Sequence, residues 1–198
     1  MIKGHYKTLV GSVFAVLIVA SASHAQGTLS EGAILNSLQG SGQAAQAAGV
    51  NLDALRRDVE SRIAAEVAEN AASPLPVLQA LQTLPNLTVQ IQFALNSAWI
   101  RPVSWETMGR IADALHHPLL LSNKFAVVGH TDATGTRKLN LKLSQQRADA
   151  VRDMLISMFR IEANRLVAIG LGEEQLQDPN NPDAAVNRRV QLLNIGPR

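Results

Sequence analysis

Asp132 and Arg147 are the two residues whose types and spacing could do chemistry together. Asp132 lies in a turn after an apolar run, and Arg147 lies within a helical pattern further along the chain. Arg147 shares an i, i+4 stripe with apolar residues, which places it on their helix face: Leu139, Leu143, Val151 and Leu155. A buried guanidinium without an acidic partner is costly, because it loses its hydration. Two interpretations follow: an internal Asp132–Arg147 ion pair, or two groups that bind the ammonium and carboxylate of a zwitterionic ligand.

The elements that must position this pair can be predicted from periodicity. Short apolar or alternating runs predict strands at 88–93, 125–128, 165–169 and 190–195. Spacings of three and four predict helices at 103–116 and 139–158. Strands that alternate with helices in the order βαβαββ indicate an α/β (α+β) sandwich. The turn that carries Asp132 then connects the second strand to the helix that carries Arg147.

Residues 1–25 have the layout of a cleaved secretory signal peptide, and the alternative is an uncleaved N-terminal membrane anchor. A basic start with Lys3 and Lys7 precedes an apolar run, and Ser23-His24-Ala25 offers a cleavage site. Two of the 18 basic residues and none of the 16 acidic ones fall in this stretch, so 16 of each sign remain. A near-neutral chain gives no reason to expect nucleic acid as a partner. The lack of cysteine excludes disulfides, cysteine-ligated metals and a lipidated cysteine.

Residues 26–86 are expected to form a helical, low-complexity N-terminal region and linker before a domain at 87–198. Asn51 is expected to cap an amphipathic helix at 52–69, and Pro74 and Pro76 follow it. The apolar side of this helix must pack on something. The alternatives are the domain, a second copy of the chain, or an envelope protein partner.

Several motifs follow one another in the second half of the chain: Gly129-His130-Thr131-Asp132, Gly135, Asn140, Leu143-Ser144, Arg147-Ala148, Val151, Gly170-Leu171-Gly172-Glu173 and Asn187-Arg188-Arg189-Val190. In this order they resemble the OmpA-like C-terminal domain, a peptidoglycan-binding module, over about residues 87–196. The resemblance implies a mixed sheet with helices packed on one side. It also implies a periplasmic protein of the cell envelope, associated with the outer membrane or with a partner there, that tethers the envelope to the wall without covalent chemistry.

The resemblance also implies roles for individual residues. Asp132 would bind the ammonium of a diaminopimelate side chain in the stem peptide, and Arg147 would bind its carboxylate. Asn140 would bind the ligand or cap the helix, and Asn96 would line the pocket from the first loop. Thr134 would shape the turn, where a backbone N–H could bind the ligand's carboxylate. The sequence departs from the family at Ala94, where an acid or amide often stands, and at Asp183-Ala184, where a Gly-Arg pair is common. Asn187, Arg188 and Arg189 are expected to brace the last strand and loop.

Other chemistries have less support. His130 is expected to be a satisfied histidine at a strand end, since no two histidines of residues 26–198 have metal-ligand spacing. Ser144 lies in a helix without a nucleophile-elbow pattern. We therefore expect no catalytic residue, metal or cofactor. A wall hydrolase and an adaptor that anchors a partner through the N-terminal helix stay as alternative functions.

Overall fold

The computed structural model describes residues 29–39, 51–64 and 81–197. Its helices and strands, apart from short 3-10 turns, are α1 (Glu31–Leu38), α3 (Leu52–Ala64), β1 (Asn86–Val89), α5 (Trp105–His116), β2 (Asn123–His130), α6 (Arg137–Ser157), β3 (Leu166–Gly172) and β4 (Val190–Pro197). From β1 onward this is the predicted βαβαββ order. The predicted signal peptide lies outside the described residues, and so do residues 65–69 of the predicted N-terminal helix.

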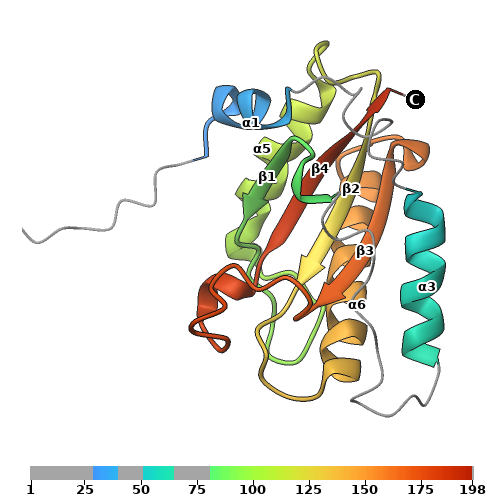
Figure 1. The fold of residues 1–198 in the computed structure, drawn as a ribbon. Coiled ribbons are helices and arrows are strands. Elements are labelled where there is room, and N and C mark those ends of the chain that lie inside the picture. The colour runs from blue at the N-terminus through green and yellow to red at the C-terminus, as the bar shows by residue number, and fades with distance from the viewer. Residues whose placement is uncertain (1–28, 40–50, 65–80, 198) are drawn as a thin grey trace, which may run out of the picture.

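The four strands form one mixed sheet in the order β1-β4-β2-β3. β2 and β3 run parallel, whereas β4 runs antiparallel to both β1 and β2. The C-terminal ends of β1, β2 and β3 therefore all lie at the same end of the sheet, where β4 begins. Figure 1 shows the three loops that leave these strands gathered at the lower end of the sheet. This end brings together chain segments that are far apart in sequence.

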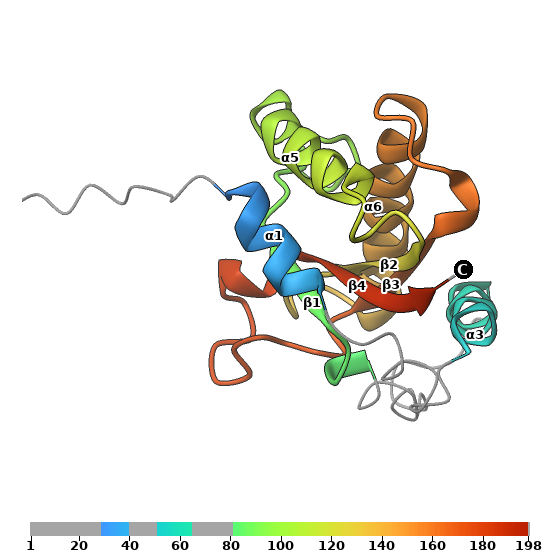
Figure 2. The same ribbon diagram turned by 90° about the horizontal axis from the view of Figure 1, so that it is seen from above.

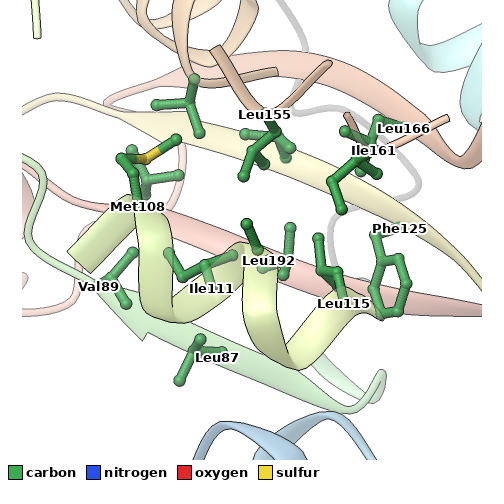
Figure 3. Packing of buried hydrophobic residues seen from close by; sticks show 14 of the residues in the cluster. Leu87, Val89, Met108, Ile111, Leu115, Phe125, Leu155, Ile161, Leu166 and Leu192 are labelled. Carbon is green, nitrogen blue, oxygen red and sulfur yellow. The ribbon is translucent and has the colours of Figure 1, made fainter. Parts of the chain in front are cut away.

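Helices α5 and α6 pack on one face of the sheet, which confirms the predicted fold class (Figure 2). The core between them includes Met108, Ile111 and Leu115 of α5 and Leu155 of α6, with Phe125 of the central strand (Figure 3). Each of these side chains is at most 2% exposed. Burial of each such side chain contributes roughly 1.5–3 kcal/mol.

The helices of the N-terminal region pack on the sheet domain. Ile34 and Leu38 of α1 are fully buried in the α5 side of the core. Leu52, Leu55 and Val59 of α3 pack on the opposite face of the sheet, near β3. Asn51 caps α3 as predicted, because its Oδ1 accepts the Ala54 N–H at 2.9 Å. The apolar side of α3 therefore packs on the sheet domain over Leu52–Ala64.

The first strand is shorter and earlier than the predicted 88–93. β1 ends at Val89, which pairs with Val190, the first residue of β4. Beyond that point no neighbouring strand remains to pair with. The chain instead folds back on itself, and Phe93 makes one isolated bridge to Ile100.

The buried face of α6 differs from the predicted apolar stripe. Leu139 is 61% exposed, and the buried residues of α6 are Asn140, Leu141, Ser144, Gln145, Ala148, Val151, Met154 and Leu155. Three of these are polar because α6 lies directly on the backbone of β2 and β3. The stripe through Arg147 therefore runs from solvent at Leu139 to the core at Leu155. Among the described helices, none is long and apolar enough to cross a membrane.

Candidate functional site

Glycines let the first half of α6 approach the ends of β2 and β3. A Cβ on Gly129 would lie 2.3 Å from the Ser144 carbonyl oxygen, and one on Gly170 would lie 2.2 Å from the Gln145 backbone nitrogen. Contacts this short do not occur, so any side chain at these glycines would push α6 away. The glycines thus fix the depth at which Arg147 sits above the sheet.

Polar side chains of α6 then pair with the outer edge of β3. Ser144 Oγ accepts the Gly172 N–H at 2.8 Å. Gln145 Oε1 accepts the Gly170 N–H at 2.7 Å, and its Nε2 donates to the Ala168 carbonyl at 3.2 Å. These bonds satisfy edge groups that a sheet otherwise leaves open. They also hold the rotation of the helix, and therefore the direction in which Arg147 leaves it.

Asp132 lies in the turn after β2 and is only 9% exposed. Its Oδ2 accepts Arg188 Nη1 at 2.6 Å, and its Oδ1 accepts the Thr134 N–H at 3.1 Å. Burial acts to raise the pKa of Asp132, but the bonds from Arg188 and Thr134 outweigh it and hold the pKa below its usual value. The carboxylate is therefore ionised at neutral pH, and it keeps acceptor capacity for a further donor.

Arg147 projects from α6 into the same end of the fold and is half-buried. Its Nε donates to the Ser97 carbonyl at 3.1 Å, and its guanidinium carbon lies 4.9 Å from the centre of the Phe93 ring. Burial lowers the pKa of Arg147, the charge of Arg188 lowers it further, and the charge of Asp132 raises it. No ion pair among residues 29–39, 51–64 and 81–197 includes Arg147. A half-buried cation with one carbonyl partner is an incomplete anion site.

The internal Asp132–Arg147 ion pair, one of the two interpretations from sequence, is wrong. Asp132 pairs with Arg188 instead. Arg188 follows a 3-10 turn at Ala185–Asn187, and this turn delivers it across the site from the loop before β4. The three charged groups still influence one another, because both Arg188 and Asp132 shift the pKa of Arg147.

Asn140 does not cap α6 and is buried. The cap is Thr136, whose Oγ1 accepts the Leu139 N–H at 3.3 Å, so the capping alternative is wrong. The Asn140 amide instead donates to Glu173 Oε2 at 2.6 Å and ties α6 to the loop after β3. This bond makes Asn140 a positioning residue at the border of the site.

Thr134 and Asn96 are both exposed at the site end of the fold. The backbone N–H of Thr134 is occupied by Asp132, so it is not free for a ligand carboxylate. Asn96 has a positive φ of 49°, and its side chain makes no hydrogen bond to any described residue. It lies one residue from Ser97, whose carbonyl accepts Arg147 Nε.

The motif Asn187-Arg188-Arg189 contains one residue of the site and two residues that hold the loop before β4. Asn187 Nδ2 donates to the Pro182 carbonyl at 2.9 Å, and Arg189 Nη2 donates to the Gln175 carbonyl at 2.8 Å. These two act as predicted. Arg188 does not: its side chain, 47% exposed, closes over Asp132. The sequence offered one signal for this difference, since alternate residues entering a strand point to opposite faces.

His130 is buried and bonded to one partner. Its Nε2 lies 2.8 Å from Gln191 Oε1, while Nδ1 has no partner among the described residues. Burial lowers the pKa of His130 to about 3, with a further contribution from the charge of Arg189. In the described part of the chain, no three His, Asp or Glu side chains gather as a metal site would require.

The chain is similar to known proteins over this part of its length. The model of the OmpA family matches residues 92–189. Outer membrane porin F of Pseudomonas aeruginosa is 31% identical over 57% of this chain and 32% of its own length. Peptidoglycan-binding protein ArfA of Mycobacterium tuberculosis is 30% identical over 52% of this chain and 31% of its own. The chain thus spans about a third of the length of these two relatives.

A solved structure shows the same fold over a longer stretch. The crystal structure of a MotB-like protein from Desulfovibrio vulgaris superposes with a TM-score of 0.50 and 21% identity. The match covers 79% of this chain and 98% of that one. The motifs, the mixed four-stranded sheet and the match to the family model agree over residues 92–189, which form an OmpA-like C-terminal domain.

Proposed function

We propose that this protein binds peptidoglycan noncovalently in the periplasm and tethers the cell envelope to the wall. Peptidoglycan binding is supported at the level of the family, since relatives that share this domain include a protein named as peptidoglycan-binding. Relatives are also outer membrane proteins. The observation that carries the proposal for this chain is Arg147, a half-buried guanidinium without a carboxylate partner among the described residues, beside an ionised Asp132.

The ligand that fits is the diaminopimelate side chain of a stem peptide. Its carboxylate would complete the donors of Arg147, and its ammonium would bind Asp132. Asp132 can accept the ammonium in addition to Arg188 and Thr134, because a carboxylate has about four acceptor positions. Arg188 is partly exposed and can turn toward the ligand carboxylate as well. Each charge-assisted hydrogen bond of this kind is worth roughly 1.5–3 kcal/mol.

A single site of this size binds weakly on its own. The wall presents the same stem peptide many times, so a second copy of the chain or attachment to an envelope partner would raise the effective affinity without new contacts. Because ion pairs carry the binding, salt should weaken it. No step of this function needs a metal, a cofactor or bond cleavage.

A sacculus pull-down of residues 26–198 tests the proposal. The variants are Asp132→Ala and Arg147→Ala. The matched controls are Asp53→Ala and Arg57→Ala on α3, where both side chains are exposed. The parent and both controls should sediment with the wall, while both site variants stay in solution with an unchanged circular dichroism spectrum. Retention of either folded site variant on the wall would contradict the proposal, and so would release of soluble muropeptides from the wall by the parent.

A further inference from the structure

The loop after β1 forms a tight hairpin that makes one wall of the site. The Ala94 N–H donates to the Trp99 carbonyl at 2.9 Å, and the Trp99 N–H donates to Ser97 Oγ at 2.9 Å. Phe93 and Ile100 form a bridge at its base. Arg147 Nε then bonds the Ser97 carbonyl from α6. The tip is thus held by hydrogen bonds from both within and outside the hairpin.

The tip of this hairpin carries large apolar side chains that are exposed to solvent. Leu95 is 92% exposed and Trp99 is 59% exposed. The indole N–H of Trp99 and the side-chain amide of Asn96 make no hydrogen bond to any described residue. Large apolar side chains that cluster on the surface can mark a binding surface, and a rigid tip loses little conformational entropy when it binds.

The combination of an aromatic face with free amide and indole donors suits a sugar. The C–H face of a pyranose packs on an indole ring, while its hydroxyl and acetamido groups need hydrogen-bond partners. A tryptophan offers both an apolar surface and a polar tip. A flat lipid surface would instead be favoured by basic side chains among the apolar ones, and residues 94–99 contain none.

We propose that Trp99 and Asn96 bind the sugar that carries the stem peptide, so that the domain recognises glycan and peptide together. This inference rests on the proposed function, because the peptide must first sit at Asp132 and Arg147. Diaminopimelate is the third residue of the stem, and three residues span at most about 11 Å. Since Arg147 bonds the hairpin at Ser97, the sugar end of a bound stem can lie against the hairpin tip.

Calorimetric titration with two purified ligands tests this inference. One is the free stem tripeptide with diaminopimelate, and the other is the same tripeptide on its GlcNAc–MurNAc disaccharide. The parent should bind the disaccharide peptide about fivefold more tightly than the free peptide, which is the size of one stacking contact. Trp99→Ala should remove this preference and leave the affinity for the free peptide within about twofold. Trp99→Phe should keep part of the preference, and Asn96→Ala should reduce it.

Leu119→Ala is the matched control, because Leu119 is also 59% exposed but lies in the loop between α5 and β2, at the opposite end of the sheet. It should keep the full preference. Equal affinity of the parent for both ligands, or an equal loss for both in Trp99→Ala, would overturn the inference while the peptide site stands. Sedimentation of the parent, but not of Trp99→Ala, with phosphatidylethanolamine–phosphatidylglycerol vesicles would assign the tip to a membrane instead. Failure of the parent to bind either ligand would overturn the proposed function itself.

Discussion

Each end of the sheet has an arginine over a phenylalanine ring, but the two arginines differ in how many of their donors have acceptors among the described residues. At the end where β2 begins, Arg165 lies 5.6 Å from the Phe125 ring and is 1% exposed. Its Nε donates to the Asn123 carbonyl, and its Nη2 donates to the carbonyls of Leu115 and Leu120. At the end where β2 stops, the Ser97 carbonyl is the one hydrogen-bond partner of Arg147 among the described residues.

The difference separates a structural arginine from a binding one. Arg165 closes the C-terminal end of α5, where unpaired carbonyls and the helix dipole favour a cation. Arg147 is held in direction by the Phe93 ring and the Ser97 carbonyl, yet it keeps donors that no described residue fills. Burial alone therefore does not mark the binding residue. The number of unfilled donors at a half-buried charge does.

The largest expected effect is on stability, at the end of the sheet that holds Arg165. Arg165→Met should lower the free energy of unfolding by about 3–5 kcal/mol, because several buried carbonyls lose a charged donor. Urea denaturation measures the loss, with the exposed Arg57→Met as the control. A loss below about 1 kcal/mol would remove the contrast between the two ends.

The next effect concerns the glycines that set the depth of α6. Gly170→Ala should lower the free energy of unfolding by about 2–3 kcal/mol, since its Cβ would overlap the backbone at Gln145. Gly109→Ala is the control: it lies within α5, and the nearest atom to its Cβ is 3.7 Å away. That change should stabilise the protein by about 0.5–1 kcal/mol. Equal effects of the two changes in urea denaturation would show that α6 is free to shift.

A smaller effect, on ligand affinity, is expected at the end of the sheet that holds Arg147. Arg147→Lys keeps the charge but loses the planar guanidinium that can bind a carboxylate through two bonds. The affinity for the stem tripeptide should fall by about 1.5–3 kcal/mol, while the free energy of unfolding changes by less than about 1 kcal/mol. Calorimetric titration and urea denaturation measure the two quantities. A lysine variant that binds as tightly as the parent would show that Arg147 acts only as a point charge.

The pH dependence of stability gives the smallest expected change, counted for each unit of pH. Burial lowers the pKa of His130 to about 3, so below pH about 6.5 the unfolded chain binds a proton that the folded chain excludes. Stability should be complete above that pH and should fall by up to about 1.4 kcal/mol per pH unit as pH drops toward 3. His130→Gln should flatten this slope between pH 6.5 and 4.5 in urea denaturation. An unchanged slope would place the effect on other groups, because the lowered pKa of Asp132 confines its own contribution to lower pH.

The strand and helix order could be predicted because short apolar runs mark the strands and spacings of three and four mark the helices. The length of β1 could not, because it depends on where its antiparallel partner begins, at Val190. The buried face of α6 was predicted only in part: Val151 and Leu155 are buried, but Leu139 is exposed. Ser144 and Gln145 are polar by type but buried by their bonds to the edge of β3, and helical periodicity alone cannot indicate such bonds.

The site was predictable in its two main residues but not in their partners. Asp132 and Arg147 stand out by charge, spacing and motif. Arg188 lies between Asn187 and Arg189, which hold the loop. The turn at Ala185–Asn187 is what brings Arg188, and not its neighbours, to Asp132. Phe93 and Ser97 lie about fifty residues before Arg147, so their role depends on the fold of the hairpin.

The most direct test of the account is to observe the two arginines together during titration with the stem tripeptide. The Nε–H resonances of Arg147 and Arg165 can be followed by ¹⁵N NMR and assigned from the Arg147→Lys and Arg165→Met variants. We predict that the Arg147 resonance shifts with ligand and saturates, whereas the Arg165 resonance stays fixed. A ligand that binds without moving the Arg147 resonance would contradict the claim that this guanidinium is left open for it.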